Sequence, residues 1–427
     1  MKRELISHPK TGQTYHKITT PGGLTILCWP LEGYKAVHAV YGTGYGSVDT
    51  SFTLNGVRHD SPAGIAHFLE HKMFENENGQ DAFELYAATG AAGNAFTSFD
   101  KTCYIFTATD KIDEALDILI SFVSKPYFTD ETVAKEQGII GQEIKMYDDQ
   151  HAWRMLFTLL GAMYFNSPVK EDIAGTVQSI AQITPEMLYT CTDAFYNQYN
   201  MVLSVAGGIT PEQVVAAVER AAIPQKQAPV VQRILPQEPH EIKQRETVFH
   251  MFVSQPVLGL AYKIDPPAPE ARLQAEMVAE MLAELIVGDT TPLYRALYDE
   301  GFIGPGFGAE VLSGQGYFSI IFSGEVNEPH EVRARITAEI TRLQREGISE
   351  ELFTACKNRF WGEAVSEMES VDDLATGLAS AQMRGLNYFE GIDVIASITL
   401  GQVNDALRTW LVDEQMVSVF ILPQEGE

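Results

Sequence analysis

The chain has 427 residues, of which 45% are hydrophobic and 20% charged, with a formal net charge of −27 and a pI near 4.7. This composition is typical of a folded globular protein and excludes a largely disordered chain, and the length suits two domains of roughly 200 residues each. The acidic balance argues against binding to nucleic acid or to anionic membranes, whereas basic or neutral peptides are better tolerated.

The cysteines and the lengths of the apolar runs indicate the cellular compartment of the protein. No C-x-x-C pair occurs among the four cysteines, which are Cys28, Cys103, Cys191 and Cys356. The first ten residues contain no apolar run of signal-peptide length, and no segment reaches 18 uninterrupted apolar residues. We therefore expect a bacterial cytoplasmic protein with reduced, buried thiols and no membrane span.

The first predicted elements are two strands at residues 24–29 and 36–45, followed by a helix at 63–74. Ser61 and Pro62 suit the start of that helix, because serine caps helices and proline fits the first turn.

The helix at 63–74 carries the pattern H-x-x-E-H in His67, Glu70 and His71. In a helix, residues four apart lie on one face, so the two imidazoles can bind one metal ion. Glu70 lies close to the same face and can take a proton from a water bound to that ion. This order is the inverted form of the zincin signature H-E-x-x-H.

The next elements are a short helix at 79–90, strands at 94–99 and 102–109, and an amphipathic helix at 112–123. From the pattern alone, two interpretations are equally well supported: a strand pair with a function of its own and an ordinary structural hairpin.

A catalytic zinc site usually has a third protein ligand and leaves its fourth position to water. The helix predicted at 130–147 supplies candidates, because Glu136 and Glu143 are seven residues apart and share one stripe with the apolar Ile139 and Ile140. We expect this stripe to point inward, where two carboxylates are costly without a cation or hydrogen bonds.

The rest of the first half ends in a segment rich in proline and glutamine at 223–241, which we predict to be a domain linker. Before it lie predicted helices at 152–164, 185–196 and 211–222 and a buried strand at 201–207.

The order of elements repeats after the linker. Residues 129–143 find a counterpart in 349–363, shifted by 220, and residues 183–202 find one in 398–417, shifted by 215. The sequence therefore predicts two copies of one α/β unit: an N-terminal domain at 1–222, the linker at 223–241 and a C-terminal domain at 242–427.

The second copy has no H-x-x-E-H pattern. Residues 271–287 have apolar side chains at helical spacing, which predicts a core helix. Glu363 takes the position of Glu143 but has no histidine nearby in its own half, so we expect a solvated or capping role.

Taken together, these motifs resemble the pitrilysin and insulin-degrading family of zinc metallopeptidases, and its short bacterial members in particular. The likeness covers essentially the whole chain. Besides the metal motif and the two glutamates it includes residues 93–102, similar to the family's active-site edge strand, and 137–149.

The resemblance implies an α+β fold of two homologous α/β-roll domains that face each other around a chamber. It implies Zn²⁺ on His67, His71 and Glu143, with Glu70 as the catalytic base and Glu136 supporting a ligand histidine. The alternative, with Glu136 as ligand and Glu143 as support, stays open, and the ligand set alone leaves manganese or cobalt possible.

The resemblance also implies how peptides bind. The strand that contains Asn94, Ala95, Phe96 and Thr97 would pair with an extended substrate backbone, which gives affinity without strong side-chain selectivity.

One feature of the family is missing. Active single-chain members carry an Arg and, seven residues later, a Tyr in their C-terminal half, whereas here Tyr298 stands at the Arg position and Gly304 or Pro305 at the Tyr position. We therefore predict a zinc endopeptidase that works as the zinc-bearing subunit of a heterodimer, with a homodimer as the other possible assembly. The competing interpretation is a structural subunit of the same fold without proteolysis.

Overall fold

The computed structural model describes residues 1–77, 79–224 and 227–424. They form two compact units, each built from three segments of the chain. Unit 1 comprises Met1–Ile144, Asp172–Ile234 and Ala364–Glu390, and unit 2 comprises Lys145–Glu171, Leu235–Glu363 and Gly391–Glu427. Each half of the chain thus contributes one segment to the other half's unit, and the sequential division at 223–241 stays a prediction.

Unit 1 is organised around a seven-stranded sheet in which only β3 and β9 run parallel. Its strands, in spatial order, are β1 (Lys2–Ser7), β2 (Thr14–Thr19), β3 (Thr25–Pro30), β9 (Met201–Gly207), β4 (Val37–Thr43), β8 (Thr102–Ala108) and β7 (Ala92–Thr97). A smaller sheet contains β10 (Val231–Arg233), β5 (Ser51–Leu54) and β6 (Val57–Asp60). The predicted linker therefore contains a strand, β10.

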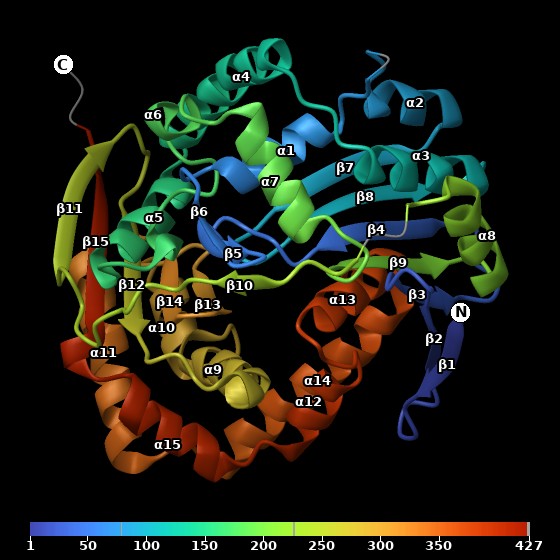
Figure 1. Cartoon of the computed structure of the whole chain (residues 1–427). Helices are drawn as coiled ribbons and strands as arrows, with labels where there is room; N and C mark the ends of the chain where they lie inside the picture. The colour runs from blue at the N-terminus through green and yellow to red at the C-terminus, as the bar shows by residue number, and fades with distance from the viewer. Residues whose placement is uncertain (78, 225–226, 425–427) are drawn as a thin grey trace. The chain divides into compact units, whose positions relative to one another are not determined.

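Helices cover both faces of the central strands of unit 1. The helices are α1 (Ile65–Met73), α2 (Ala82–Thr89), α3 (Ile112–Ser124), α4 (Asp130–Asp148), α6 (Val177–Ile180), α7 (Pro185–Phe195), α8 (Pro211–Ala221) and α13 (Val371–Met383). Figure 1 shows α1 and α3 on one side of the sheet and α13 on the other. Every residue of β4 and β9 is consequently buried, which explains why both strands read as continuous, largely apolar runs.

Unit 2 has a five-stranded sheet with the order β11 (Glu246–Met251), β15 (Met416–Pro423), β12 (Val257–Lys263), β14 (Tyr317–Glu325) and β13 (Gly308–Gly314). Its helices are α5 (His151–Met163), α9 (Arg272–Val287), α10 (Pro292–Asp299), α11 (Pro329–Glu346), α12 (Glu350–Ser366), α14 (Glu390–Ser397) and α15 (Leu400–Trp410). Helix α5 lies on β12 and β15, so closely that a Cβ atom at Gly259 would come within 2.3 Å of Met155 Sδ. Both sheets are mainly antiparallel, so the predicted α+β class is confirmed.

The two units repeat one order of elements. α5 and α13 differ by 220 at both ends, and α7 and α15 differ by 215 at both ends. The strands agree as well, because β9 and β15 each lie between a parallel and an antiparallel neighbour.

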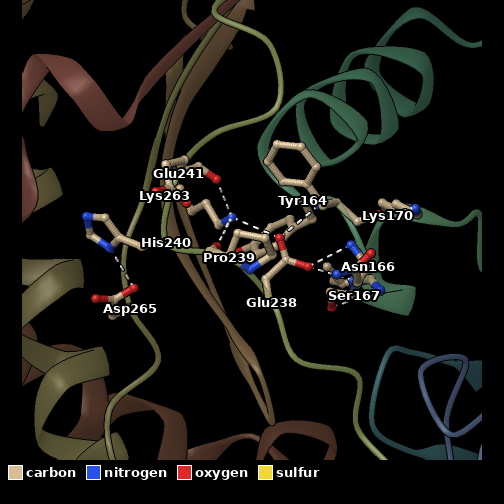
Figure 2. A network of polar contacts seen from close by, with 12 residues as sticks. Tyr164, Asn166, Ser167, Lys170, Glu238, Pro239, His240, Glu241, Lys263 and Asp265 are labelled. Atoms are coloured by element: carbon tan, nitrogen blue, oxygen red, sulfur yellow. Dashed lines mark hydrogen bonds and ion pairs between the residues drawn. The ribbon is translucent and has the colours of Figure 1, made fainter.

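The partly buried carboxylate of Glu238 holds the end of the predicted linker within unit 2 (Figure 2). Glu238 accepts hydrogen bonds from the backbone N–H groups of Phe165, Asn166 and Ser167 at 2.8, 2.7 and 2.8 Å. Burial alone would raise the pKa of the Glu238 carboxyl, but the N–H of Phe165 and the ammonium group of Lys263 hold it below its ordinary value. The charged form of Glu238 therefore stabilises the fold.

Lys263 of β12 is the cation in this network. Its Nζ atom donates to Glu238 at 2.9 Å and to the carbonyl oxygens of Pro239 and Glu241 at 2.7 and 2.8 Å. The ammonium group also lies 5.1 Å from the centre of the Tyr164 ring. All three donors of this buried lysine are thus used, which compensates for its removal from water.

All four cysteines are free and buried, as the sequence predicted. Among residues 1–77, 79–224 and 227–424, no helix combines the length and the apolar character needed to cross a bilayer.

Candidate metal centre

Helix α1 supplies two of the three groups that meet at the candidate metal centre. The helix begins at Ile65, after Gly64 in a left-handed conformation with φ of 91°, so the expected start at Ser61 and Pro62 is wrong. A Cβ atom at Gly64 would come within 2.5 Å of the Ala174 carbonyl oxygen, so only glycine fits this entry to the helix. One turn apart on α1, the rings of His67 and His71 have their centres 4.6 Å from each other.

Helix α4 brings the third group, Glu143, to the two imidazoles. Its carboxylate oxygens lie 3.6 Å from His67 Nε2 and 3.5 Å from His71 Nε2. All three ligand atoms are within 4.8 Å of one another. Ligand atoms bound to a tetrahedral zinc ion at about 2.1 Å lie roughly 3.4 Å apart, so the two distances to Glu143 and the donor set fit zinc.

The stripe of α4 differs from the expected one at a single residue. Glu136 and Ile140 are buried, but Ile139 is 48% exposed, so its predicted inward orientation is wrong. Ile139 and Ile140 are neighbours, and neighbouring helical side chains point about 100° apart.

The two histidines have different electrostatic surroundings. Burial and, secondarily, the neighbouring His71 lower the pKa of His67 to about 3, so its imidazole is neutral at neutral pH and available as a ligand. Within the described chain, the buried Nδ1 atom of His67 has no hydrogen-bond partner. For His71, burial opposes protonation, but hydrogen bonding to Glu136 and the charge of Glu143 raise its pKa above the ordinary value.

Glu136 contacts the side of His71 that faces away from Glu143. Its Oε1 atom lies 3.0 Å from His71 Nδ1, whereas the Nε2 atom is the one near Glu143. A carboxylate on Nδ1 fixes the tautomer that leaves a lone pair on Nε2. The geometry thus favours Glu143 as the metal ligand and Glu136 as the group that supports His71.

Glu70 stands beside the three candidate ligands without joining them. Its side chain is buried, and Oε2 accepts a hydrogen bond from Thr97 Oγ1 at 2.6 Å. Burial raises the pKa of the Glu70 carboxyl, and the bond from Thr97 opposes that shift. Sequence reasoning missed this contact, because residues 70 and 97 belong to different elements and only the fold brings them together.

The predicted substrate strand forms one edge of the seven-stranded sheet. Strand β7 contains Asn94, Ala95, Phe96 and Thr97, and it pairs with β8 alone in the described sheet order. Its other edge can therefore accept the main chain of an extended peptide.

Comparison with known proteins identifies the family to which a chain with these features belongs. Residues 54–177 match the family described as Insulinase (Peptidase family M16), and residues 182–360 match the Peptidase M16 inactive domain. The chain is 32% identical over 431 residues to a Bacillus subtilis (strain 168) protein named "Uncharacterized zinc protease YmfH", covering 98% of this chain and 99% of that protein. This chain belongs to the M16 peptidase family. The family resemblance drawn from its motifs is thus confirmed.

Solved structures agree with M16 membership. A putative M16-like peptidase from Alicyclobacillus acidocaldarius is 32% identical and superimposes with a TM-score of 0.93, covering 99% of each chain. A chain of Complex III2 from Candida albicans superimposes with a TM-score of 0.73 at 14% identity, covering 95% of each chain. The second likeness shows the fold alone.

The stretch that lacks the expected Arg and Tyr lies in unit 2 of this M16 chain. Tyr298, at the end of α10, is 48% exposed and its ring stacks on that of Tyr294 at 6.2 Å. Gly304 and Pro305 follow between α10 and β13. None of Tyr298, Gly304 and Pro305 carries a cationic side chain.

Proposed function

We propose that this M16 chain is a zinc-dependent endopeptidase that hydrolyses short or unfolded peptides. His67, His71 and Glu143 would hold the zinc ion, and Glu70 would act as the catalytic base. The observation that carries the proposal is the spacing of the carboxylate oxygens of Glu143, 3.6 and 3.5 Å from two imidazole nitrogens on one helix.

The side chains of the site divide the chemistry among them. A zinc ion bound here would lower the pKa of a coordinated water towards roughly 7 and polarise the scissile carbonyl. Glu70 would accept the water proton and deliver it to the leaving nitrogen. His67 is already neutral and would bind without first losing a proton, while Glu136 would hold His71 in the tautomer that exposes Nε2.

Strand β7 would bind the peptide by strand addition. Asn94, Ala95, Phe96 and Thr97 would offer their main-chain groups to an extended substrate. Because main-chain pairing does not depend on side-chain identity, we expect broad sequence preference and a requirement for unfolded peptides.

The assembly we propose is a heterodimer in which a homologous partner supplies the Arg and Tyr pair, in the bacterial cytoplasm. Support comes from Tyr298, Gly304 and Pro305, which cannot donate a charge-assisted hydrogen bond to a substrate carbonyl. The four free, buried thiols suit a reducing compartment.

A second candidate is a non-catalytic subunit of the same fold. The match of residues 182–360 to the M16 inactive domain is compatible with it. The converging His67, His71 and Glu143 with Glu70 beside them argue against it, because a scaffold has no physical need for this arrangement.

Metal analysis of two variants beside the wild type tests the proposal. Glu70→Gln should retain zinc and lose peptide hydrolysis by roughly a hundredfold or more, because only the base is removed. His71→Ala should lose both zinc and hydrolysis. Loss of zinc from Glu70→Gln would make Glu70 a ligand, and a wild type that binds no zinc would favour the non-catalytic subunit.

The purified wild-type protein also tests whether a partner subunit is needed for activity. The purified chain alone should hydrolyse a fluorogenic peptide weakly, and full activity as a monomer or homodimer would refute the heterodimer.

A further inference from the structure

We infer that Thr97 is a positioning residue for Glu70, and that strand β7 thereby links peptide docking to the orientation of the catalytic base. This inference rests on the proposed peptidase function. It assigns a role to the side chain of Thr97, whereas substrate pairing would use only the main chain of the same residue.

The contact is short and strong. Thr97 Oγ1 donates to Glu70 Oε2 at 2.6 Å, the distance typical of a hydroxyl that donates to a charged carboxylate. Glu70 is 7% exposed, so few water molecules can compete for this oxygen. With Oε2 held, Oε1 remains available to a catalytic water.

The hydroxyl groups of Thr97 and Thr102 lie next to each other, and each has one proton to donate. Thr102, directly opposite Thr97 in the sheet register, is fully buried and donates its own proton to the carbonyl oxygen of Tyr45 at 2.9 Å. The two threonine oxygens are 3.4 Å apart, and because the Thr102 proton already goes to Tyr45, only Thr97 could donate across that gap. The single hydroxyl proton of Thr97 points at Glu70, because the carboxylate can only accept and lies 2.6 Å away, closer than the Thr102 oxygen.

The turn after Thr97 keeps this donor in place. Ser98 N–H donates to the Lys101 carbonyl oxygen at 2.8 Å, which closes the hairpin between β7 and β8. The backbone of Ser47 in turn donates to the Ser98 carbonyl oxygen at 3.0 Å. A Cβ atom at Gly46 would come within 2.4 Å of the Asp100 nitrogen, so this loop packs tightly against the turn.

The arrangement gives β7 two tasks. Its outer edge has main-chain groups that a peptide can pair with, and its last side chain holds the base on α1. A peptide that orders β7 on binding would also order Thr97, and through it Glu70. The expected signature is an effect on turnover that exceeds the effect on substrate affinity.

Substitution of Thr97 tests the inference. Thr97→Val keeps the side-chain shape and the strand propensity but removes the donor, and it should lower kcat roughly tenfold to a hundredfold while KM stays within about twofold. Zinc affinity, measured by competition with a chelator, should not change. Thr97→Ser restores the hydroxyl and should recover most of kcat.

A matched control is Thr107→Val on β8. Its hydroxyl bonds His38 Nδ1 at 2.8 Å, so the same chemical change is made in the same sheet away from Glu70, and kcat should stay near the wild-type value. Equal kcat in Thr97→Val and wild type, equal loss in Thr97→Ser and Thr97→Val, or loss of zinc would overturn the inference.

Crystal structures of the variants separate this inference from the proposed function. Thr97→Val should release the Glu70 carboxyl from its position and Thr97→Ser should keep it there, whether or not a peptide is hydrolysed. A zinc-loaded wild type without activity on any peptide would refute the proposed function, whereas an unmoved Glu70 in Thr97→Val would refute the role of Thr97.

Discussion

The helix pair α1 and α4 in unit 1 and the pair α9 and α12 in unit 2 hold matching places in the repeated order of elements, but their carboxylates meet different partner groups. In unit 1, Glu143 faces two imidazoles. In unit 2, its counterpart Glu363 pairs with Arg359 at 2.8 Å, and that guanidinium also binds Glu284 and Asp289 at 2.6 and 2.9 Å.

The difference shows how little separates a metal centre from an ordinary ion-pair cluster. Arg359 brings its own permanent charge, so the three carboxylates of the unit 2 cluster have a cation that belongs to the chain. His67 is neutral and offers a lone pair, so the unit 1 group can bind a metal. The counterpart of Glu136 is Cys356, a buried thiol 3.9 Å from the Met281 carbonyl oxygen, and it has no imidazole to orient.

Alanine substitution of the two matched glutamates, Glu143 and Glu363, should give the largest difference in zinc content and turnover. Glu143→Ala removes a proposed ligand and should lower zinc affinity by more than about a hundredfold and abolish peptide hydrolysis. Glu363→Ala removes one partner of an exposed pair and should cost about 0.5 kcal/mol of stability without affecting zinc. Zinc content and turnover of both variants check this, and equal zinc loss would contradict the assignment.

A smaller effect on zinc affinity is expected from substitution of Glu136, which supports His71. Glu136→Gln retains an acceptor for His71 Nδ1 but loses the charge, so zinc affinity should fall by roughly ten- to a hundredfold. Cys356→Ser, the matched change in unit 2, should leave zinc affinity unchanged. Chelator competition on both variants measures the difference, and unaltered affinity in Glu136→Gln would rule out its supporting role.

The partly buried carboxylate of Glu238 in unit 2 should contribute to stability and not to metal binding. Glu238→Gln leaves the ammonium group of Lys263 without its counter-charge and should lower the free energy of unfolding at pH 7 by about 2 kcal/mol. Since the folded pKa of Glu238 is below its ordinary value, its charged form stabilises the fold above about pH 4.3. That contribution is lost as the pH falls from there through the folded pKa.

Urea denaturation of wild type and Glu238→Gln at pH 7 and at about pH 3.5 measures this. The difference between the two proteins should shrink at the lower pH. Glu241→Gln is the control, because only the carbonyl oxygen of Glu241 contacts Lys263. A difference that is constant with pH would contradict the stabilising role of the Glu238 charge.

Local sequence patterns predicted most of the framework. The spacing of His67 and His71 on one helix face and the apolar runs of β4 and β9 were sufficient to predict their elements. The repeat at 220 and 215 was visible because corresponding elements kept the same turn and capping residues, such as Thr184 and Thr399 at helix starts. Short-range periodicity depends only on local geometry, and the chain displays it directly.

Other features could not be predicted in this way. The helix start at Gly64 depends on the close approach of Ala174, more than a hundred residues later. The placement of α13 on the sheet of unit 1 and of α5 on the sheet of unit 2 depends on which apolar faces meet in space. Neither contact leaves a pattern in neighbouring residues.

The sequence by itself determined which chemical groups the protein has and the faces of the helices on which they lie: two imidazoles and a carboxylate on α1, and Glu136 and Glu143 on one stripe of α4. Only the tertiary structure decided that Glu143 meets the Nε2 atoms, that Glu136 reaches Nδ1 of His71, and that Thr97 holds Glu70. The physical reason is that periodicity within a helix orients a side chain relative to its own axis. The distance between two helices, by contrast, is set by the sheet and the core between them.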